Sequence, residues 1–436
     1  MDQDAQLLPR DKLLRDSFTP AENLLFGLIL ITANVAFWLA DPRSYWLLGF
    51  FLIAGAMIAV VLKTHEHTHP FFVTFLWPKF WLCTAPVWLL FLQFAIGLSR
   101  QPLGTMTFEG AEFVRLEIPR QSWLPVSISP ETAWPTVMGF GAILLVAVGL
   151  FIVPKSRAFI ERLMPCLCIS VVLVALFGYI QKGLDPSKPF LTKGTGAGDF
   201  FGFFPYDGHW AAFAILWTCA SISTALLTTR YNDSPAFIES SGPWYLTAGT
   251  LFGASAFLVE ARWPAAMLML TYAIMMMLVS VHFFSASRDP YRKTIGGLSG
   301  LVATGMFAAG LYRIFQSAGN SDTGGHLRQA AWEMFCDRPL FGWGMDSFGP
   351  MLPFYGSDLL LAENYERAGS DALQLLAELG IVGVIPSIAL IAFLIGRYFR
   401  KRHDIQFTNH LIVGLAAITL LAFLDSPFMS PAVFYS

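Results

Sequence analysis

Arg262 is the first residue whose position calls for a chemical explanation. It follows Glu260 closely and directly precedes an apolar stretch at 263–284. An arginine in hydrocarbon costs about 2.5–3.5 kcal/mol at the centre of a membrane and less toward the interface, so it usually has a partner or a task. Two interpretations stay open: an interfacial anchor paired with Glu260, or an anion clamp, because a guanidinium fork fits phosphate oxygens.

A second group of residues with chemical meaning lies in one long segment, 316–379, and in the apolar stretch that follows it. Helical spacing of apolar residues indicates that this segment is partly helical. Loops carry function where a rigid scaffold positions them, so this segment is expected to hold part of the site. Its notable residues are Arg328, Trp332, the turn Pro-Leu-Phe-Gly-Trp-Gly at 339–344, Ser370, Asp371, Leu373, Gln374, Glu378, Gly380 and Gly383.

The elements that must position these residues are membrane helices. Of the 436 residues, 55% are hydrophobic and 13% are charged, against about 25% charged in soluble domains. The net charge of −2 offers no basic field for nucleic acid. A membrane helix needs about 20 apolar residues. The stretches that meet this length lie at 21–40, 45–62, 80–98, 134–153, 163–181, 209–228, 244–261, 263–284, 294–315, 380–398 and 410–431.

The predicted fold is therefore an all-α polytopic membrane protein with 11 to 12 transmembrane helices, because 71–79 either lengthens the third span or forms another. The whole chain, 1–436, is expected to be one integral membrane domain. The polar tail at 1–20 leads straight into an apolar stretch, and no small-residue cleavage site follows that stretch, so the first span is expected to be a retained helix.

Lys and Arg residues predict the orientation. With the tail inside, most of the 28 basic residues fall in short inner connections near helix ends, as the positive-inside rule expects. The tail is then cytoplasmic, and the long outer loops are 99–133, 182–208 and 316–379. Arg262 and Arg328 both fall on the outer side, which is the periplasmic face in a bacterial inner membrane.

The residues of the second group resemble the O-antigen ligase family, which also includes O-antigen polymerases and some protein O-oligosaccharyltransferases. That family has an Arg followed by a Trp on a helix and a Pro-Leu-x-Gly-x-Gly turn. A Ser/Asn segment with Leu-Gln then runs into Glu-x-Gly-x-x-Gly. Two looser matches are the segment at 202–213, with Asp207 in an Asn position and His209 kept, and Arg262, with Ala261 in place of a Ser.

This resemblance implies a metal-independent transfer, without a cofactor, on the periplasmic side. The partners it implies are a glycan on a polyprenyl diphosphate such as undecaprenyl diphosphate, an acceptor hydroxyl on a glycan, lipid or protein, and the lipid bilayer. Carried over by position, the diphosphate ligands are Arg262 and Arg328, with Lys193 and Arg367 as further candidates. The residues on the acceptor side are His209 and Asp371. Further substrate-binding candidates are Glu260, Trp332 and His326.

One position departs from the family pattern. A His that precedes the Ser-x-x-Leu-Gln segment is taken to assist the sugar transfer, and Gly369 stands there in this chain. Glycine has no group that accepts a proton. Three interpretations stay open. The arginines alone activate the leaving group; the protein binds a lipid-linked glycan without transferring it; or another group acts as the base. The candidates for that base are Asp371, Glu260, His209 and His326.

Other patterns in the sequence are interpreted as structural. His65, His67 and His69 alternate in a short inner connection next to Pro70, which favours a solvated connector over a metal site. The glycines at 194–198 follow no strand and precede no Gly-Lys-Ser/Thr, so they do not indicate a nucleotide site. A transporter is a further alternative, but ionisable residues near the centres of the spans, which a transporter would need, are scarce.

Overall fold

The computed structural model describes most of the chain, and the structural statements below refer to that part. The described residues are 20–39, 53–55, 57, 77–100, 102–108, 111–116, 123–152, 157–184, 200–231, 240–286, 290–315, 323–356, 365, 367–400 and 406–436. Lys193 and the connector with His65, His67 and His69 lie outside these residues.

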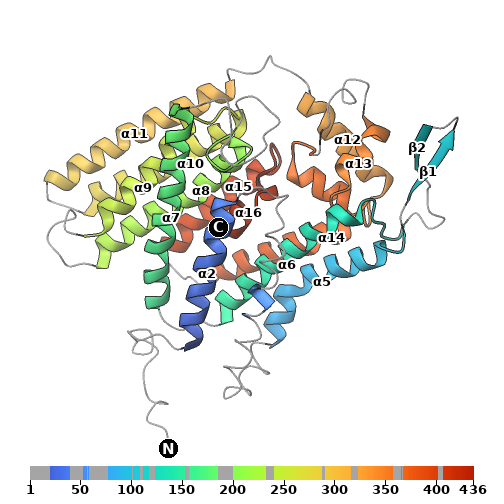
Figure 1. Cartoon of the computed structure of the whole chain (residues 1–436). Coiled ribbons are helices and arrows are strands. Elements are labelled where there is room, and N and C mark those ends of the chain that lie inside the picture. Colours follow the sequence, from blue (N-terminus) through green and yellow to red (C-terminus); the bar gives the residue numbers. More distant parts are fainter. Residues whose placement is uncertain are drawn as a thin grey trace, which may run out of the picture. The chain divides into compact units, whose positions relative to one another are not determined.

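Helices make up nearly all of the regular structure (Figure 1). In chain order the longer helices are α2 (Pro20–Trp38), α5 (Trp77–Gly97), α6 (Pro130–Ile152), α7 (Arg157–Leu184), α8 (Asp207–Tyr231), α9 (Gly242–Ala254), α10 (Arg262–Ala286), α11 (Pro290–Phe315), α12 (Thr323–Asp337), α13 (Phe348–Tyr355), α14 (Asp371–Arg400) and α15 (Gln406–Leu421). The shorter elements are β1 (Leu103–Phe108), β2 (Ala111–Leu116), η5 (Ser255–Phe257), η6 (Pro427–Met429) and α16 (Pro431–Tyr435).

The predicted all-α polytopic membrane fold is confirmed. Within the described residues, 5 helices are long and apolar enough to cross a membrane: Phe159–Leu184, Asp207–Leu227, Arg262–Phe284, Arg292–Phe315 and Asp371–Arg400. Shorter apolar helices are Glu22–Trp38, Thr84–Gly97 and Thr408–Leu421. The predicted span at 45–62 lies largely outside the described residues, and Trp77, Pro78 and Lys79 belong to α5, where they lengthen the third span.

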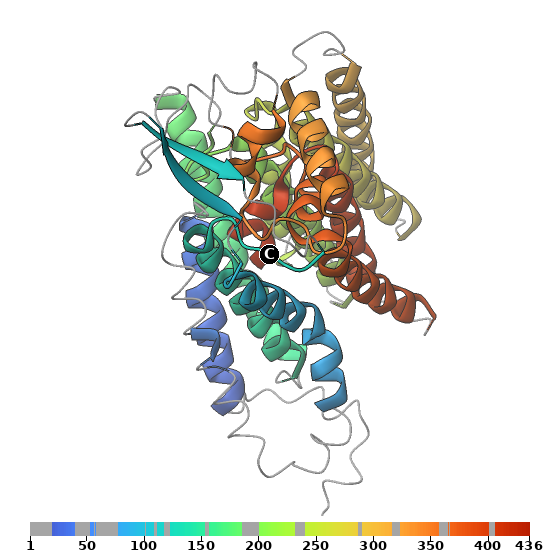
Figure 2. The ribbon, with the colours of Figure 1, turned by 90° about the vertical axis from the view of Figure 1, so that its right-hand side faces the viewer.

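Several helix ends differ from the prediction. The expected span at 244–261 is the 13-residue helix α9, which passes into the short turn η5 before α10 begins. The expected span at 410–431 ends at Leu421, where the chain passes into a turn before η6. The predicted outer loop at 99–133 contains an antiparallel hairpin, in which Leu103 pairs with Leu116 (Figure 2).

Contacts divide the chain into two compact units. Unit 1 comprises Met1–Thr32, Pro42–Leu163 and Ser321–Arg402. Unit 2 comprises Ala33–Asp41, Met164–Asn320 and His403–Ser436. Unit 1 therefore holds the described part of the segment 316–379, which is partly helical as predicted, and unit 2 holds the start of α10 with Arg262.

A hydrophobic core in unit 1 fixes the segment that carries the family-like residues. Leu327, Ala331 and Met334 lie on one face of α12, and Trp343 and Phe348 pack against them. All five side chains are buried. Residues spaced three and four apart share a helix face, so this burial follows directly from the sequence periodicity.

Helix α8 forms the centre of unit 2. It contacts α9, α10 and α15, and α10 lies side by side with α11 (Figure 1). Trp210 near the start of α8 is fully buried and stacks on Phe201, with 4.4 Å between the ring centroids. Because aromatic rings contribute large buried areas, this packing fixes the first turn of α8, where Asp207 and His209 lie.

Candidate functional site

Arg262 is the first residue of α10 and is half-buried. Its guanidinium donates a hydrogen bond to the carbonyl of Ile314 near the end of α11. It also lies over the ring of Trp263, with 4.7 Å from the Arg262 Cζ atom to the ring centroid. Arg262 therefore lies where the start of α10 meets the end of α11. The carbonyl end of α11 carries partial negative charge, which stabilises the guanidinium cation.

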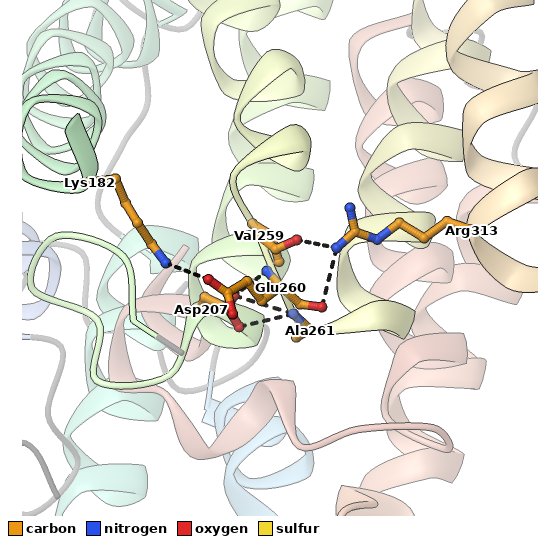
Figure 3. A network of polar contacts seen from close by, with 6 residues as sticks. All are labelled: Lys182, Asp207, Val259, Glu260, Ala261 and Arg313. Carbon is orange, nitrogen blue, oxygen red and sulfur yellow. Dashed lines mark hydrogen bonds and ion pairs between the residues drawn. The ribbon is translucent and has the colours of Figure 1, made fainter. Parts of the chain in front are cut away.

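Glu260 pairs with a lysine. The Nζ atom of Lys182, in the last turn of α7, lies 3.3 Å from the Glu260 carboxylate (Figure 3). The lysine side chain is 7% exposed and the glutamate side chain is 59% exposed. The glutamate is thus the accessible member of the pair, which suits contact with a ligand.

Charged side chains hold the backbone directly before Arg262. The buried carboxylate of Asp207 accepts hydrogen bonds from the N–H groups of Glu260 and Ala261. The guanidinium of Arg313 donates to the carbonyls of Val259 and Glu260 (Figure 3). The segment Val259–Ala261 is therefore fixed through its peptide groups.

His209 contacts the C-terminal part of unit 2. Its Nε2 atom lies 3.0 Å from the carbonyl oxygen of Ser426, which can only accept, so Nε2 carries the hydrogen. The neighbouring Tyr206 hydroxyl donates to Asp425 at 2.7 Å. With its Nε2 atom committed as a donor and its ring buried, His209 has a clear structural role in anchoring the turn at 425–426.

The glycine-rich turn in unit 1 fits into a break in α14. At Gly380 the backbone leaves the helical region, with φ 64° and ψ −172°. The turn at 339–344 fills the gap through four backbone hydrogen bonds: Trp343 N to Ala377 O at 3.0 Å, Gly344 N to Glu378 O at 2.8 Å, Ile381 N to Pro339 O at 2.8 Å and Val382 N to Leu340 O at 3.0 Å. These bonds satisfy peptide groups that the break would otherwise leave unpaired.

Glycine is required where the turn and the helix touch. Gly342 and Gly344 also have positive φ, 63° and 96°. A Cβ atom at Gly342 would overlap the backbone of Glu378, and one at Gly380 would overlap the carbonyl of Leu340. The family-like glycine pattern in this region thus has a structural cause, which is the close approach of two backbones.

Two buried polar side chains complete this junction. Glu378 accepts hydrogen bonds from the N–H groups of Asp346, at 2.9 Å, and of Phe348, at 3.4 Å, and so places a carboxyl group at the start of α13. Gln93 of α5 donates to the carbonyls of Leu379, at 3.1 Å, and of Phe341. Both residues hold the junction together.

Helix α12 presents three predicted site residues. Arg328 and His326 are half-buried, and Trp332 is 51% exposed. Arg328 makes no hydrogen bond or ion pair with any residue that the structure describes. By contrast, Arg338, the first residue after α12, is buried, donates to the carbonyl of Leu124 at 2.6 Å, and has its pKa lowered by burial. Arg328 therefore differs from Arg338 in having no polar partner among the described residues.

The start of α14 brings the last predicted residues together. Ser370 caps the helix, with its hydroxyl 3.4 Å from the Leu373 N atom. Asp371 is the first helical residue and is fully buried, and Arg367 is half-buried. Gly369 has φ 64°, and a Cβ atom built there would meet nothing within 4 Å.

The predicted site residues thus form two groups. His209, Glu260 and Arg262 lie in unit 2. The group in unit 1 comprises His326, Arg328, Trp332, Arg367 and Asp371. Among the described residues, no group of three or more His, Cys, Asp or Glu side chains is arranged to hold a metal ion.

Sequence reasoning gave no role to Asp207, Lys182 or Arg313. One signal for Arg313 was available. Helices α10 and α11 are joined by a short connection, so the start of α10 and the end of α11 lie at the same end of the pair. A basic residue at each of these ends, Arg262 and Arg313, indicates a shared charged site.

A multi-pass, all-α membrane protein with charged residues gathered at helix ends is the class that this fold and these contacts define. Residues 236–388 match the family model described as O-antigen ligase. The matched region includes α10, α11, α12 and the junction of the glycine-rich turn with α14. The resemblance to the O-antigen ligase family is therefore confirmed over this region. No curated protein and no solved structure matches the chain.

Proposed function

We propose that this protein transfers a glycan from a polyprenyl-diphosphate carrier, such as undecaprenyl diphosphate, to an acceptor hydroxyl at the periplasmic face of a bacterial inner membrane. The observation that carries the proposal is the family match at 236–388, which spans both Arg262 and Arg328. Family members of this type are ligases or polymerases, so a lipid-linked glycan and a second sugar, lipid or protein acceptor are the substrates to test.

The two arginines have defined roles in this proposal. They bind the diphosphate and stabilise the negative charge that develops on it as the bond between the sugar carbon and the phosphate oxygen breaks. The acceptor oxygen forms the new bond to that carbon, and its proton passes to a base. The guanidinium of Arg328 has no polar partner among the described residues, which supports its role, because a phosphate oxygen would displace no bond to them.

Glu260 is the base that the geometry favours among the candidates. Its carboxylate is more than half exposed, and it lies two residues from Arg262. Asp371 and His209 are buried, and His326 is half-buried. A general base must reach the proton that it removes, so exposure favours Glu260.

A second candidate function is supported by Gly369. Without the family His, the protein would bind a lipid-linked glycan and release it unchanged. A purified protein that captures a labelled lipid-linked glycan without ever transferring it would have this function.

A complementation experiment tests the proposal. A strain that lacks its own O-antigen ligase would receive the wild type, Arg262→Ala, Arg262→Lys or Arg400→Ala, and surface glycan would be scored on gels at confirmed expression. We expect transfer by the wild type and by Arg400→Ala, an exposed arginine at the end of α14. Arg262→Ala should abolish transfer, and Arg262→Lys should retain part of it. Full transfer by Arg262→Ala would remove Arg262 from the mechanism.

A further inference from the structure

We propose that Asp207 and Arg313 are positioning residues for Arg262, which act by holding the segment Val259–Ala261 from two sides. The expected effect on glycan transfer rests on the proposed function. The restraint of the segment by hydrogen bonds does not depend on that function. Hydrogen bonds between described residues support this proposal, and they give a task to two charged side chains that the mechanism above leaves unused.

Asp207 holds the N–H groups of the segment. It is the first residue of α8 and is fully buried. Its carboxylate accepts from the N–H of Glu260, and from the N–H of Ala261 with oxygen distances of 3.3 and 3.4 Å. Ala261 immediately precedes α10, so this carboxylate lies at the helix N-terminus, where negative charge is stabilising.

Arg313 holds the carbonyl groups of the same segment. It lies in the last turn of α11, and one guanidinium nitrogen donates to Val259 O and, at 3.2 Å, to Glu260 O. Figure 3 shows Arg313 and Asp207 approaching the segment from opposite sides. Hydrogen bonds with one charged partner are roughly twice as strong as neutral ones. Two such groups therefore restrict the segment more than an ordinary loop is restricted.

The contacts between α10 and α11 are reciprocal. Arg313 of α11 binds the backbone just before α10, and Arg262 of α10 binds the carbonyl of Ile314, the residue after Arg313. The position of the Arg262 guanidinium therefore depends on the backbone that Asp207 and Arg313 hold. A displacement of about 1 Å in an active site can cost about 100-fold in rate, so this support matters for a residue that binds a leaving group.

Hydrogen–deuterium exchange of the full-length protein in lipid nanodiscs tests the holding directly. The amides of Glu260 and Ala261 should exchange roughly 10- to 100-fold faster in Asp207→Ala than in the wild type, and by a smaller factor in the isosteric Asp207→Asn. Tyr206→Phe is the matched control, because it removes a neighbouring hydrogen bond that goes to Asp425. Unchanged exchange of the two amides in a folded Asp207→Ala protein would overturn the proposal.

A transfer assay then tests the positioning. Asp207→Asn and Arg313→Gln should each lower transfer about 10- to 100-fold, and each loss should be smaller in the Arg262→Lys background, which retains measurable transfer. Full transfer by Asp207→Asn and Arg313→Gln, or losses of undiminished size in the Arg262→Lys background, would overturn the positioning role. The exchange measurement needs no active enzyme, so failure of the proposed function and failure of this inference give different results.

Discussion

Arg262 and Arg328 differ in what their guanidinium groups contact. Arg262 donates to the carbonyl of Ile314 and stacks on Trp263, so its position is set before any ligand binds. Arg328 is half-buried on α12 and has no polar partner among the described residues. A preorganised cation supplies electrostatic stabilisation without reorganisation during the reaction. By this criterion Arg262 is the better candidate for stabilising the leaving group, and Arg328 for initial capture of the donor.

The chemistry missing at Gly369 can be restored by substitution. Gly369→His and Gly369→Ala should both fold, because a Cβ atom there meets nothing within 4 Å. Each should lose roughly 1–2 kcal/mol of stability, since the backbone has positive φ and histidine tolerates that region better than most residues. Transfer in the complementation strain should rise with His and not with Ala.

Thermal unfolding in detergent would measure the stability of both Gly369 variants. Equal transfer by the wild type and Gly369→His would show that another group already serves as the base. A protein that fails to fold with either substitution would contradict the open space at this position.

At the scale of elements, the break in α14 is the feature that most depends on its residues. The turn at 339–344 supplies hydrogen bonds to both sides of Gly380, and Gln93 takes up the carbonyl of Leu379. Peptide groups in a membrane-spanning helix must be satisfied inside the protein, because lipid offers no partners. The break and the turn are therefore one structural unit, and neither is expected to form without the other.

Alanine at the break should be far more costly than alanine elsewhere in α14. Gly380→Ala would force a side chain into a conformation that is nearly exclusive to glycine and into the carbonyl of Leu340, at a cost of about 3 kcal/mol or more. Gly396→Ala, on the same helix with nothing within 4 Å, should be neutral or stabilising by up to about 1 kcal/mol. Thermal unfolding and the yield of folded protein would compare the two, and similar behaviour would refute the docking of the turn.

At the scale of the whole molecule, the distribution of basic residues predicts the membrane orientation. The positive-inside rule predicts that the segment 316–379 lies in the periplasm. Cys336 in α12 is an exposed native thiol within that segment, whereas Cys219 is buried. Cys166 is also exposed, but it lies near the end of α7 that the same rule predicts to face the cytoplasm. An impermeant maleimide added to spheroplasts should therefore label the wild type, and Cys336→Ser should abolish that labelling. Labelling that appears only after the cells are opened would reverse the orientation.

The sequence predicted the fold class and the family resemblance, because both rest on features that hydropathy and local motifs carry. Five described candidate spans, including α10 and α11, fall where apolar stretches had placed them. The hairpin at 103–116 and the break at Gly380 were not predicted. Both depend on pairing between separate backbone segments, which a local hydrophobic pattern does not encode.

The site was predicted only as a set of residue types. Sequence reasoning selected Arg262 and Glu260 and left open an ion pair between them; in the structure Glu260 pairs with Lys182. Asp207 accepts hydrogen bonds from backbone N–H groups. Every residue except proline has such a group, so the sequence contains no particular side chain that would reveal the contact. The roles of all these side chains in catalysis stay predictions.

The way in which the segment before Arg262 is held has a consequence for finding distant relatives. Asp207 and Arg313 bind only peptide atoms of Val259, Glu260 and Ala261, so these contacts set no requirement on the side chains there. Ala261 can then replace the serine of the family pattern without loss of the contact. Divergent homologues would be recognised by an acidic residue at the position of Asp207 and an arginine at the position of Arg313. This holds even when the residues directly before the equivalent of Arg262 have changed.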